Sequence, residues 1–299
     1  MPELPDVTVY VEALEQRVLG QPLTAFSILS PFVLRTVEPP LQAAVGSPVK
    51  CVARLGKRIV LDFGDELFVV IHLMIAGRFR WFAAGARKKL PARMALVDFE
   101  FPTGSLLLTE AGSKRRASLH VVRGKGALAQ FDRGGLEVLD ATRQQFAERL
   151  AREHHTLKRS LTDPRLFSGI GNAYSDEILH RARLSPVKQS HRLTEDEITR
   201  LFDATRDTLV GWTDVLRAER GDGFPEKVTA FREGMAVHGR FREPCPVCGT
   251  PVQRIRYSAN ETNYCATCQT EGRLLADRGL SRLLKEDWPK SIEEMDWVT

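Results

Sequence analysis

The chain has 299 residues, of which 43% are hydrophobic and 27% charged, with a net charge of +5 and a pI near 9.0. This length predicts two or three domains, and this composition excludes wholesale disorder. No apolar run reaches the roughly 18 residues of a membrane span. Met1-Pro2-Glu3 opens the chain without a basic region, so neither a membrane protein nor a signal peptide is expected.

The first 135 residues are predicted to form an antiparallel β-sandwich or barrel. An opening helix is predicted by apolar residues at helical spacing, with Pro5 in its first turn and Gly20 at its end: Val7, Val11, Leu14 and Val18. Short β-branched and aromatic runs follow at 59–63, 67–71, 78–82, 94–101, 105–108 and 117–122. The turns between them, such as 64–66 and 102–104, are too short for parallel crossovers.

Gly134 and Gly135 mark a predicted joint, after which the apolar period becomes helical, at 146 and 150, 157 and 161, and 178 and 179. Thr194 and Glu197 form a capping box at the start of a further helix. Residues 136–237 are therefore predicted to form a helical domain. The whole chain reads as an α+β multidomain protein.

Four cysteines near the C-terminus form two C-x-x-C pairs, Cys245 with Cys248 and Cys265 with Cys268, separated by sixteen residues. The two pairs complete a tetrahedral set of thiolates around one Zn²⁺ and leave no open position, so the metal is expected to be structural. Strand-like segments at 252–258 and 262–265 flank a turn at 259–261, which predicts a β-hairpin zinc finger over 238–275 and a tail at 276–299. Cys51 lies among apolar residues and is expected to be a reduced core thiol.

Basic residues bunch along the chain, which favours a polyanion as partner. The bunches are Lys114 to Arg116 with Arg123 and Lys125, Lys158 with Arg159, Arg181 with Arg183, and Arg240 with Arg242. Taken singly, such a run is more often a solvated face. Together with a zinc element and a glycine-rich turn between helices, the bunches indicate nucleic acid.

The second residue offers a nucleophile. Removal of Met1 would leave Pro2 with a secondary amine, whose pKa of about 8 lies well below the 10.4 of lysine. Attack on a sugar aldehyde carbon would give an iminium ion that cannot lose a proton from nitrogen and so promotes elimination. Glu3 beside it could act as acid and base. Alone this signal is weak, because Met-Pro-Glu also begins inert chains.

Four stretches, in this order, carry a resemblance to a known family: 1–7, 53–57, 161–179 with its Gly169 to Glu177 segment, and the hairpin cysteines. Together they resemble the formamidopyrimidine-DNA glycosylase/endonuclease VIII family of base-excision repair enzymes, from Pro2 to about Leu284. The resemblance implies a β-sandwich, a helix-two-turn-helix domain and a zinc finger. It also implies damaged double-stranded DNA as partner, with the damaged nucleotide flipped out. We expect a cytoplasmic monomer, associated with the nucleoid if the source is bacterial.

The resemblance assigns roles by position. Pro2 would attack C1′ and expel the base, Glu3 would assist ring opening, and Lys57 would contact phosphate and aid elimination. Asn172 matches the asparagine that binds the phosphate beside the lesion, and the neighbouring glycines would allow backbone amides to approach an anion. His72 and Asp6 match positions near the DNA and the active-site water, although either could be a satisfied polar residue.

The chain departs from the family in two loops. The finger turn holds Asn260 where the family has an arginine, and the candidates to compensate for it are Arg254 and Arg256 on the preceding strand. In the sandwich loops, Ile75 stands at a methionine position and no phenylalanine accompanies the basic run that begins with Lys114 and Arg115. This run is interpreted as contacting phosphate or entering the duplex, with a solvated loop as the alternative.

Three functions remain open. The favoured one is a base-excision repair glycosylase that removes an oxidised or otherwise damaged base and cleaves the abasic site by β- or β,δ-elimination through a Schiff base on Pro2. The second is a member of the same fold that binds damaged or abasic DNA without glycosylase action. The third is a zinc-containing nucleic-acid-binding module unrelated to repair, in which Pro2 and Glu3 have no role.

Overall fold

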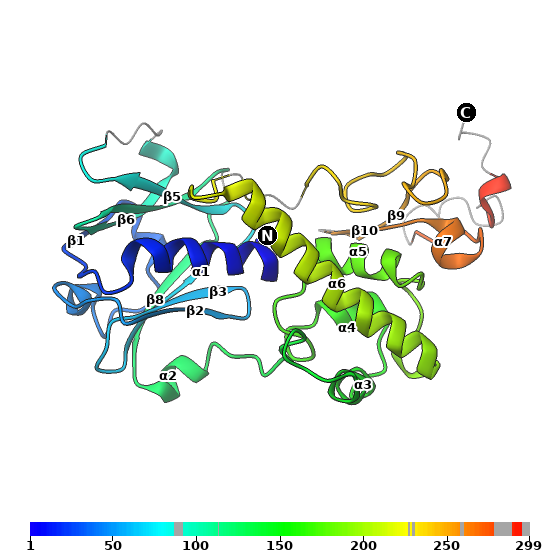
Figure 1. The fold of residues 1–299 in the computed structure, drawn as a ribbon, viewed down its shortest axis with the longest axis horizontal. Helices are drawn as coiled ribbons and strands as arrows, with labels where there is room; N and C mark the ends of the chain where they lie inside the picture. The colour runs from blue at the N-terminus through cyan, green and yellow to red at the C-terminus, as the bar shows by residue number, and fades with distance from the viewer. Residues whose placement is uncertain are drawn as a thin grey trace. The chain divides into compact units, whose positions relative to one another are not determined.

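The computed structural model describes residues 1–86, 92–112, 114–226, 228, 231–257, 260–277 and 289–294 (Figure 1). The chain divides into two compact units. Residues 1–133 with 212–229 form the first unit, and residues 134–211 with 230–299 form the second. The long helix α6 (Glu195–Arg220) begins in the second unit and ends in the first.

The first unit holds helix α1 (Leu4–Val18) and two antiparallel four-stranded sheets, with strand orders β1-β6-β7-β5 and β2-β3-β4-β8. The strands are β1 (Ala25–Ile28), β2 (Cys51–Leu55), β3 (Arg58–Asp62), β4 (Leu67–His72), β5 (Gly77–Ala83), β6 (Ala95–Phe101), β7 (Gly104–Glu110) and β8 (Ser118–Arg123). Helix α2 (Lys125–Ala129) and the single turns Pro31–Val33, Leu41–Ala44 and Ala92–Met94 complete it. The predicted antiparallel sandwich with an opening helix is confirmed.

One core lies between the two sheets and under α1. Alternate residues of β4 enter it, among them Val69 and Ile71, while Phe68 and Val70 join a smaller cluster on the other face of their sheet. Helix α1 adds four fully buried side chains at helical spacing: Val7, Tyr10, Leu14 and Val18. Burial of each such side chain contributes about 1.5–3 kcal/mol. The spacing that predicted the helix is therefore the spacing that fills the core.

Cys51 is the first residue of β2, and its side chain is exposed, so the prediction of a core thiol was wrong. The next residue, Val52, enters the core. Because successive side chains of a strand point to opposite faces, the neighbour of a core residue points away from that core.

Residues 212–229 close the first unit from far along the sequence. Phe224 packs against the core, with its ring 5.7 Å from that of Tyr10. Near the end of α6, Arg217 donates from Nη2 to Oε1 of Glu12 in α1 at 2.6 Å. The end of α6 is therefore an integral part of the first unit.

The second unit is helical, as predicted, and contains α3 (Arg143–Ala151), α4 (Leu157–Thr162), α5 (Asn172–Arg181), the turn Ser190–Arg192 and the first part of α6. The ring of Phe146 in α3 lies 4.7 Å from Phe167 and 5.5 Å from Phe202. The predicted capping box opens α6, since the Thr194 N–H donates to Glu197 and the Glu197 N–H donates to Thr194.

The finger is a two-stranded hairpin, β9 (Gln253–Arg256) and β10 (Glu261–Tyr264), followed by α7 (Ala266–Thr270). Its strands differ from the predicted ones, because β9 ends before Tyr257 and β10 already begins at Glu261. Tyr264 is buried, and its hydroxyl accepts a hydrogen bond from the Leu275 N–H at 2.8 Å. A last turn spans Ile292–Glu294; most of the predicted tail lies outside the described residues.

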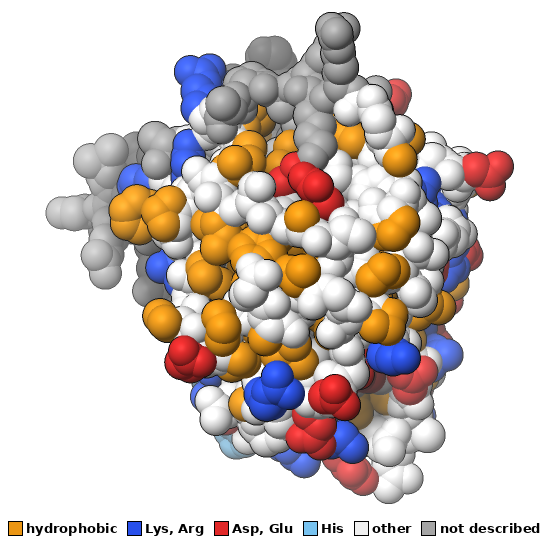
Figure 2. All heavy atoms as spheres, turned by 90° about the vertical axis from the view of Figure 1, so that its left-hand side faces the viewer, with side chains coloured by type: hydrophobic (Ala, Val, Ile, Leu, Met, Phe, Trp, Pro, Cys, Tyr) orange, Lys and Arg blue, Asp and Glu red, His pale blue; other side chains and the backbone are white. Residues whose placement is uncertain are grey.

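Figure 2 shows a face of the molecule on which apolar side chains gather near the centre, with charged side chains mostly below them. The large apolar side chains exposed in the first unit include Leu19, Leu29, Phe32, Val37 and Ile75. In the part of the chain that is described, no helix combines the length and the apolar character needed to cross a lipid bilayer.

Candidate functional site

The N-terminus of the chain is buried at the start of α1. Pro2 is buried, and Glu3 and Asp6 are only 2% and 3% exposed. The Glu3 N–H donates to Oδ2 of Asp6 at 2.9 Å, which satisfies one of the free N–H groups at this helix end. Asp6 therefore holds the backbone beside Pro2 in place.

The α-amino group of Met1 has a lowered pKa, chiefly because burial disfavours its charged form. The negative charges of Glu3 and Asp6 raise this pKa, while the positive charges of Arg78 and Lys57 lower it. Both cations are therefore near the terminus. A lowered pKa leaves more of an amine uncharged, and so nucleophilic, at neutral pH.

Lys57 lies in the two-residue turn between β2 and β3. Leu55 pairs with Arg58 across this turn, and Gly56 has a φ of +62°, a conformation that glycine adopts at little cost. The glycine thus fixes the turn that carries the half-buried Lys57.

His72 ends β4, where it pairs with Arg58 of β3 and with Ser118 of β8. Burial, followed by the positive charges of Arg58 and Lys57, lowers the pKa of His72 to about 4. The imidazole is therefore neutral at neutral pH and has one N–H to donate.

The turn after His72 presents an apolar tip. Ile75 is 60% exposed, and Met74 before it has a φ of +51°. A Cβ on Gly77 would lie 2.2 Å from the carbonyl oxygen of Leu73, so only glycine fits there. Arg78 donates from Nη1 to the Gly77 carbonyl oxygen at 2.6 Å. The backbone conformation at Met74 and Gly77 therefore fixes the shape of this turn.

The basic loop after β7 is organised by a carboxylate that the sequence did not single out. Glu110 is 2% exposed and accepts hydrogen bonds from the Arg116 and Ala117 N–H groups at 2.9 and 3.0 Å. Lys114 is exposed, and Arg115 donates to Oγ of Ser30 at 3.3 Å. The loop is thus fixed at its base, with Lys114 facing solvent.

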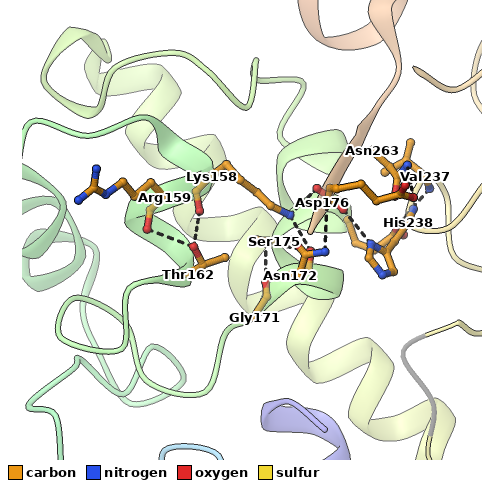
Figure 3. A network of polar contacts seen from close by, with 12 residues as sticks. Lys158, Arg159, Thr162, Gly171, Asn172, Ser175, Asp176, Val237, His238 and Asn263 are labelled. Carbon is orange, nitrogen blue, oxygen red and sulfur yellow. Dashed lines mark hydrogen bonds and ion pairs between the residues drawn. The ribbon is translucent and has the colours of Figure 1, made fainter. Parts of the chain in front are cut away.

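In the second unit, Asn172 begins α5 and meets the finger. Its Nδ2 donates to the carbonyl oxygen of Glu261 at 3.0 Å (Figure 3). Lys158 of α4 donates to the Asn172 carbonyl oxygen at 2.7 Å and to Oδ1 of Asp176 at 2.5 Å, and Oδ2 of Asp176 lies 2.8 Å from Nδ1 of His238. This network ties α4, α5 and the segment before the finger together.

Several basic residues of the predicted bunches are committed to such pairs. Lys158 is bound to the buried Asp176, Arg181 pairs with Asp207 at 2.9 Å, and Arg240 pairs with Glu243 at 2.8 Å. The positive charges of these three side chains are therefore already paired with carboxylates of the protein. The clustering of basic residues in the sequence therefore overstated the number of positive charges available to bind a polyanion.

At the finger tip, Asn260 is exposed, and its carbonyl oxygen accepts from the Tyr257 N–H at 2.8 Å. Arg254 lies 4.1 Å over the ring of Phe241 and 3.5 Å from Glu261. Arg256 pairs with Glu261 in the hairpin, and its side chain is exposed. Within the described ranges, no hydrogen bond or ion pair involves the guanidinium of Arg256.

The thiols of Cys245, Cys248, Cys265 and Cys268 converge, with all four Sγ atoms within 4.8 Å of one another. A tetrahedral zinc with Zn–S bonds of about 2.3 Å sets its sulfurs about 3.8 Å apart, so the four cysteines fit one zinc ion. His180 of α5 reaches this cluster, with Nε2 3.3 Å from Sγ of Cys245. Such an outer contact orients a metal ligand.

The structure thus gathers the predicted residues into two sets, each inside one unit. Pro2, Glu3, Asp6 and Lys57 lie together in the first unit, and Asn172 meets the finger strand that follows Asn260 in the second. Arg78 and Glu110 were missed. Arg78 contacts the Gly77 carbonyl oxygen and Glu110 contacts the Arg116 and Ala117 N–H groups, and such backbone partners leave no residue-specific signal in the sequence.

Comparison with protein families gives three matches along the chain. Residues 1–117 match the formamidopyrimidine-DNA glycosylase N-terminal domain, residues 136–212 the formamidopyrimidine-DNA glycosylase H2TH domain, and residues 242–270 a zinc finger found in FPG and IleRS. The matches follow the order of the sandwich, the helices and the finger.

Among the relatives of this chain, the formamidopyrimidine-DNA glycosylase of Thermus thermophilus is 32% identical over 91% of this chain and 100% of its own length. That of Exiguobacterium sibiricum is 30% identical over 90% and 99%. In fold, the chain is similar to Lactococcus lactis Fpg in complex with DNA containing an abasic site, with a TM-score of 0.78 at 24% identity, covering 90% of this chain and 99% of that one.

Proposed function

The chain belongs to the formamidopyrimidine-DNA glycosylase family, and from this premise we propose that it is bifunctional, removing a damaged base from duplex DNA and then cleaving the abasic site. The observation that supports the lyase half is the buried N-terminus, where Pro2 and Glu3 lie beside Asp6 and within the influence of Lys57. A candidate nucleophile, a candidate acid and a nearby cation in the first unit support this proposal.

In the first step, after removal of Met1, the Pro2 nitrogen bonds to C1′ of the damaged nucleotide. The bond from C1′ to the base breaks, the base leaves with that electron pair and takes up a proton, and the Pro2 nitrogen loses its own proton, which frees its lone pair. Glu3 then gives a proton to the ring oxygen as the C1′–O bond opens, and an iminium joins Pro2 to C1′. Asp6, which caps the helix, acts here by holding Glu3 in place.

In the second step, the iminium accepts the electrons released when a base removes a proton from C2′. The resulting enamine expels the 3′ phosphate, which leaves with the electron pair of its C–O bond. A positive charge beside the leaving phosphate stabilises it, and Lys57 is suited to this role. Asn172 and Asn260 of the second unit would bind phosphates of the same DNA, as neutral donors.

The experiment is reduction by borohydride in the presence of duplexes that carry different oxidised or abasic sites. Reduction fixes an iminium as a stable bond, and mass spectrometry of the digested adduct identifies the residue. We expect an adduct on Pro2. Absence of an adduct on every duplex would overturn the covalent mechanism, and an adduct on abasic DNA without release of any base would favour a damage-binding protein with lyase action alone.

Two variants test the roles. Pro2→Gly should greatly reduce trapping, and Glu3→Gln should lower formation of the iminium, and with it trapping, by about 100-fold or more, the usual contribution of a general acid. Both should keep DNA affinity within about threefold, because neither removes a phosphate contact. The intact mass of each protein shows whether Met1 is absent. An undiminished adduct in Pro2→Gly would mean that another amine reacts.

A further inference from the structure

Arg78 follows Gly77 at the start of β5, and its guanidinium is bound to backbone carbonyl groups on two sides. On one side it donates from Nη1 to the Ile75 and Gly77 carbonyl oxygens at 3.1 and 2.6 Å. On the other side its Nε donates to the carbonyl oxygen of Val228, 150 residues later in the chain. One side chain thus joins the turn before β5 to the residues 212–229 that complete the first unit.

The segment that holds Val228 follows β5 over most of its length. The Phe224 ring lies 6.5 Å from the ring of Trp81, and Oε2 of Glu226 lies 3.8 Å from Nη1 of Arg80. Residues 224, 226 and 228 therefore meet residues 81, 80 and 78 in reverse order, so that the segment runs antiparallel to β5. Of these three contacts, the one made by Arg78 is nearest to the turn.

The start of β5 lies close to the start of α1. The N–H of Phe79, the residue after Arg78, donates to the Tyr10 hydroxyl at 3.4 Å, and the two rings meet edge-on at 5.6 Å. Tyr10 is about one helical turn after Asp6, whose carboxylate accepts from the Glu3 N–H. Packing of β5 against α1 therefore brings Arg78 into the neighbourhood of the N-terminus.

The charge of Arg78 acts on the N-terminal amine. Burial is the main reason that the pKa of this amine is lowered, and the charge of Arg78 lowers it further, by more than that of Lys57. Glu3 and Asp6 act in the opposite direction. An amine near a fixed cation loses its proton at a lower pH and is then nucleophilic. A guanidinium stays charged at every working pH, so its effect on the amine is constant.

We propose that Arg78 is a positioning residue for the reaction at the N-terminus, which binds the turn that carries Ile75 to the segment of Val228 and stands as a fixed cation near the amine. The placement of the guanidinium follows from its contacts with three carbonyl groups. Its value for catalysis rests on the proposed function. Arginine suits both tasks, because its planar fork donates in several fixed directions whereas the ammonium of lysine is a point charge.

The matched variants are Arg78→Gln and Arg80→Gln, which remove the same charge from the same strand and each lose a contact with the same segment. The rate of adduct formation with saturating abasic duplex is measured against pH, by borohydride trapping. In Arg78→Gln the midpoint of this profile should rise by about half a pH unit or more, which leaves about threefold less unprotonated amine below the midpoint. Arg80→Gln should keep the wild-type midpoint. Equal midpoints in Arg78→Gln and the wild type would overturn the electrostatic role.

Arg78→Lys separates the charge from the hydrogen bonds. It should keep the wild-type midpoint, but its maximum rate at high pH should fall about tenfold, because a lysine cannot hold the three carbonyl groups together. A maximum rate equal to that of the wild type would overturn the positioning role. Should Arg78→Gln fail to fold, Arg78→Lys decides the proposal by itself, with thermal melting as the check that it is folded.

A titration without DNA separates this proposal from the proposed function. In protein labelled with ¹³C-proline, the NMR signals of the Pro2 carbons follow the protonation of the amine in the free protein. We expect the midpoint to be higher in Arg78→Gln than in Arg80→Gln. If no duplex forms an adduct while this difference is present, the proposed function fails and the placement of Arg78 stands. If the wild type forms the adduct while the difference is absent, this proposal alone fails.

Discussion

At the scale of single residues, His72 shows how neighbours set the chemistry of a side chain. Burial and three nearby basic residues, Arg58, Lys57 and His120, oppose its protonation. A group whose pKa is lower in the folded than in the unfolded chain binds fewer protons when folded. Stability therefore falls as the pH drops from the unfolded value of about 6.5 toward the folded value.

His72→Gln should remove this loss of folding stability at low pH. The folded pKa of about 4 predicts that the variant loses less stability than the wild type between pH 6.5 and 4, by about 2–3 kcal/mol. Urea unfolding at several pH values measures it. His191→Gln, an exposed histidine, is the control. Parallel pH profiles for wild type and His72→Gln would contradict the prediction.

The two arginines of β9 have different tasks. Arg254 is held by Phe241 and Glu261, whereas Arg256 is exposed beside the tip. We therefore expect Arg256→Ala to weaken binding to abasic duplex about tenfold, since a hydrogen bond to a charged group contributes about 1.5 kcal/mol or more.

Arg254→Ala is the matched comparison. Because Arg254 contacts Phe241 and Glu261, its loss should clearly lower the melting temperature and only slightly weaken DNA binding. Fluorescence anisotropy and thermal melting of both variants measure the two effects. If Arg254→Ala weakens binding and Arg256→Ala leaves it unchanged, Arg254 supplies the charge in place of Asn260.

The sequence predicted the candidate residues where a motif is local, such as the cysteine pairs or the Pro2-Glu3 opening. It could not predict that His120 lies near His72. His120 becomes a neighbour of His72 only because β8 lies beside β4, four strands earlier in the chain. Such a neighbour is fixed by strand order, which no spacing along the sequence reveals.

At the scale of elements, several contacts hold the finger. The four thiols gather at its base, Tyr264 binds the Leu275 N–H, and Oδ1 of Asn263 accepts from the Gly239 N–H at 3.0 Å. A two-stranded hairpin is marginal in water by itself. The metal is therefore expected to supply most of its stability.

Cys248→Ser should unfold the hairpin and weaken DNA binding by about tenfold or more, because the tip loses its fixed position. Hydrogen exchange of the β9 and β10 amides and the zinc content measure the loss. Cys51→Ser is the control, since Cys51 is exposed in the first unit. Intact exchange protection in a zinc-free protein would show that side-chain packing alone holds the finger.

Most strands were predictable because each is a short run of β-branched and aromatic residues bounded by turn residues. The predicted runs at 67–71 and 78–82 became β4 (Leu67–His72) and β5 (Gly77–Ala83). The four-residue β1 (Ala25–Ile28) was missed, and the burial of its residues shows why: none is fully buried. A four-residue strand that includes Ala25 and Ser27 has too few β-branched and aromatic residues to be recognised.

At the scale of the whole molecule, the first unit is discontinuous, since residues 212–229 complete it. We predict that a fragment of residues 1–133 does not fold stably, because Tyr10 and its neighbours lose the cover of Phe224. Phe224 is half-buried, so its loss should cost less than the about 3–5 kcal/mol of a fully buried phenylalanine, but still a large share of the stability of a domain. Circular dichroism and thermal melting of the fragment measure this.

The control for the fragment is Phe224→Leu in the full chain, which keeps an apolar cover and should melt cooperatively at a lower temperature. A fragment that melts as cooperatively as the full chain would show that the first unit folds without residues 212–229.

This arrangement also affects synthesis of the protein. The N-terminal residues leave the ribosome first, and N-terminal domains generally fold first during translation. Here the core of the sandwich cannot be completed until residues 212–229 have been synthesised. It therefore stays exposed while the ribosome synthesises α3, α4 and α5. The second unit likewise cannot be completed until its finger has been synthesised. Neither unit can finish folding before most of the chain is synthesised, and the nascent protein is expected to need chaperones through that interval.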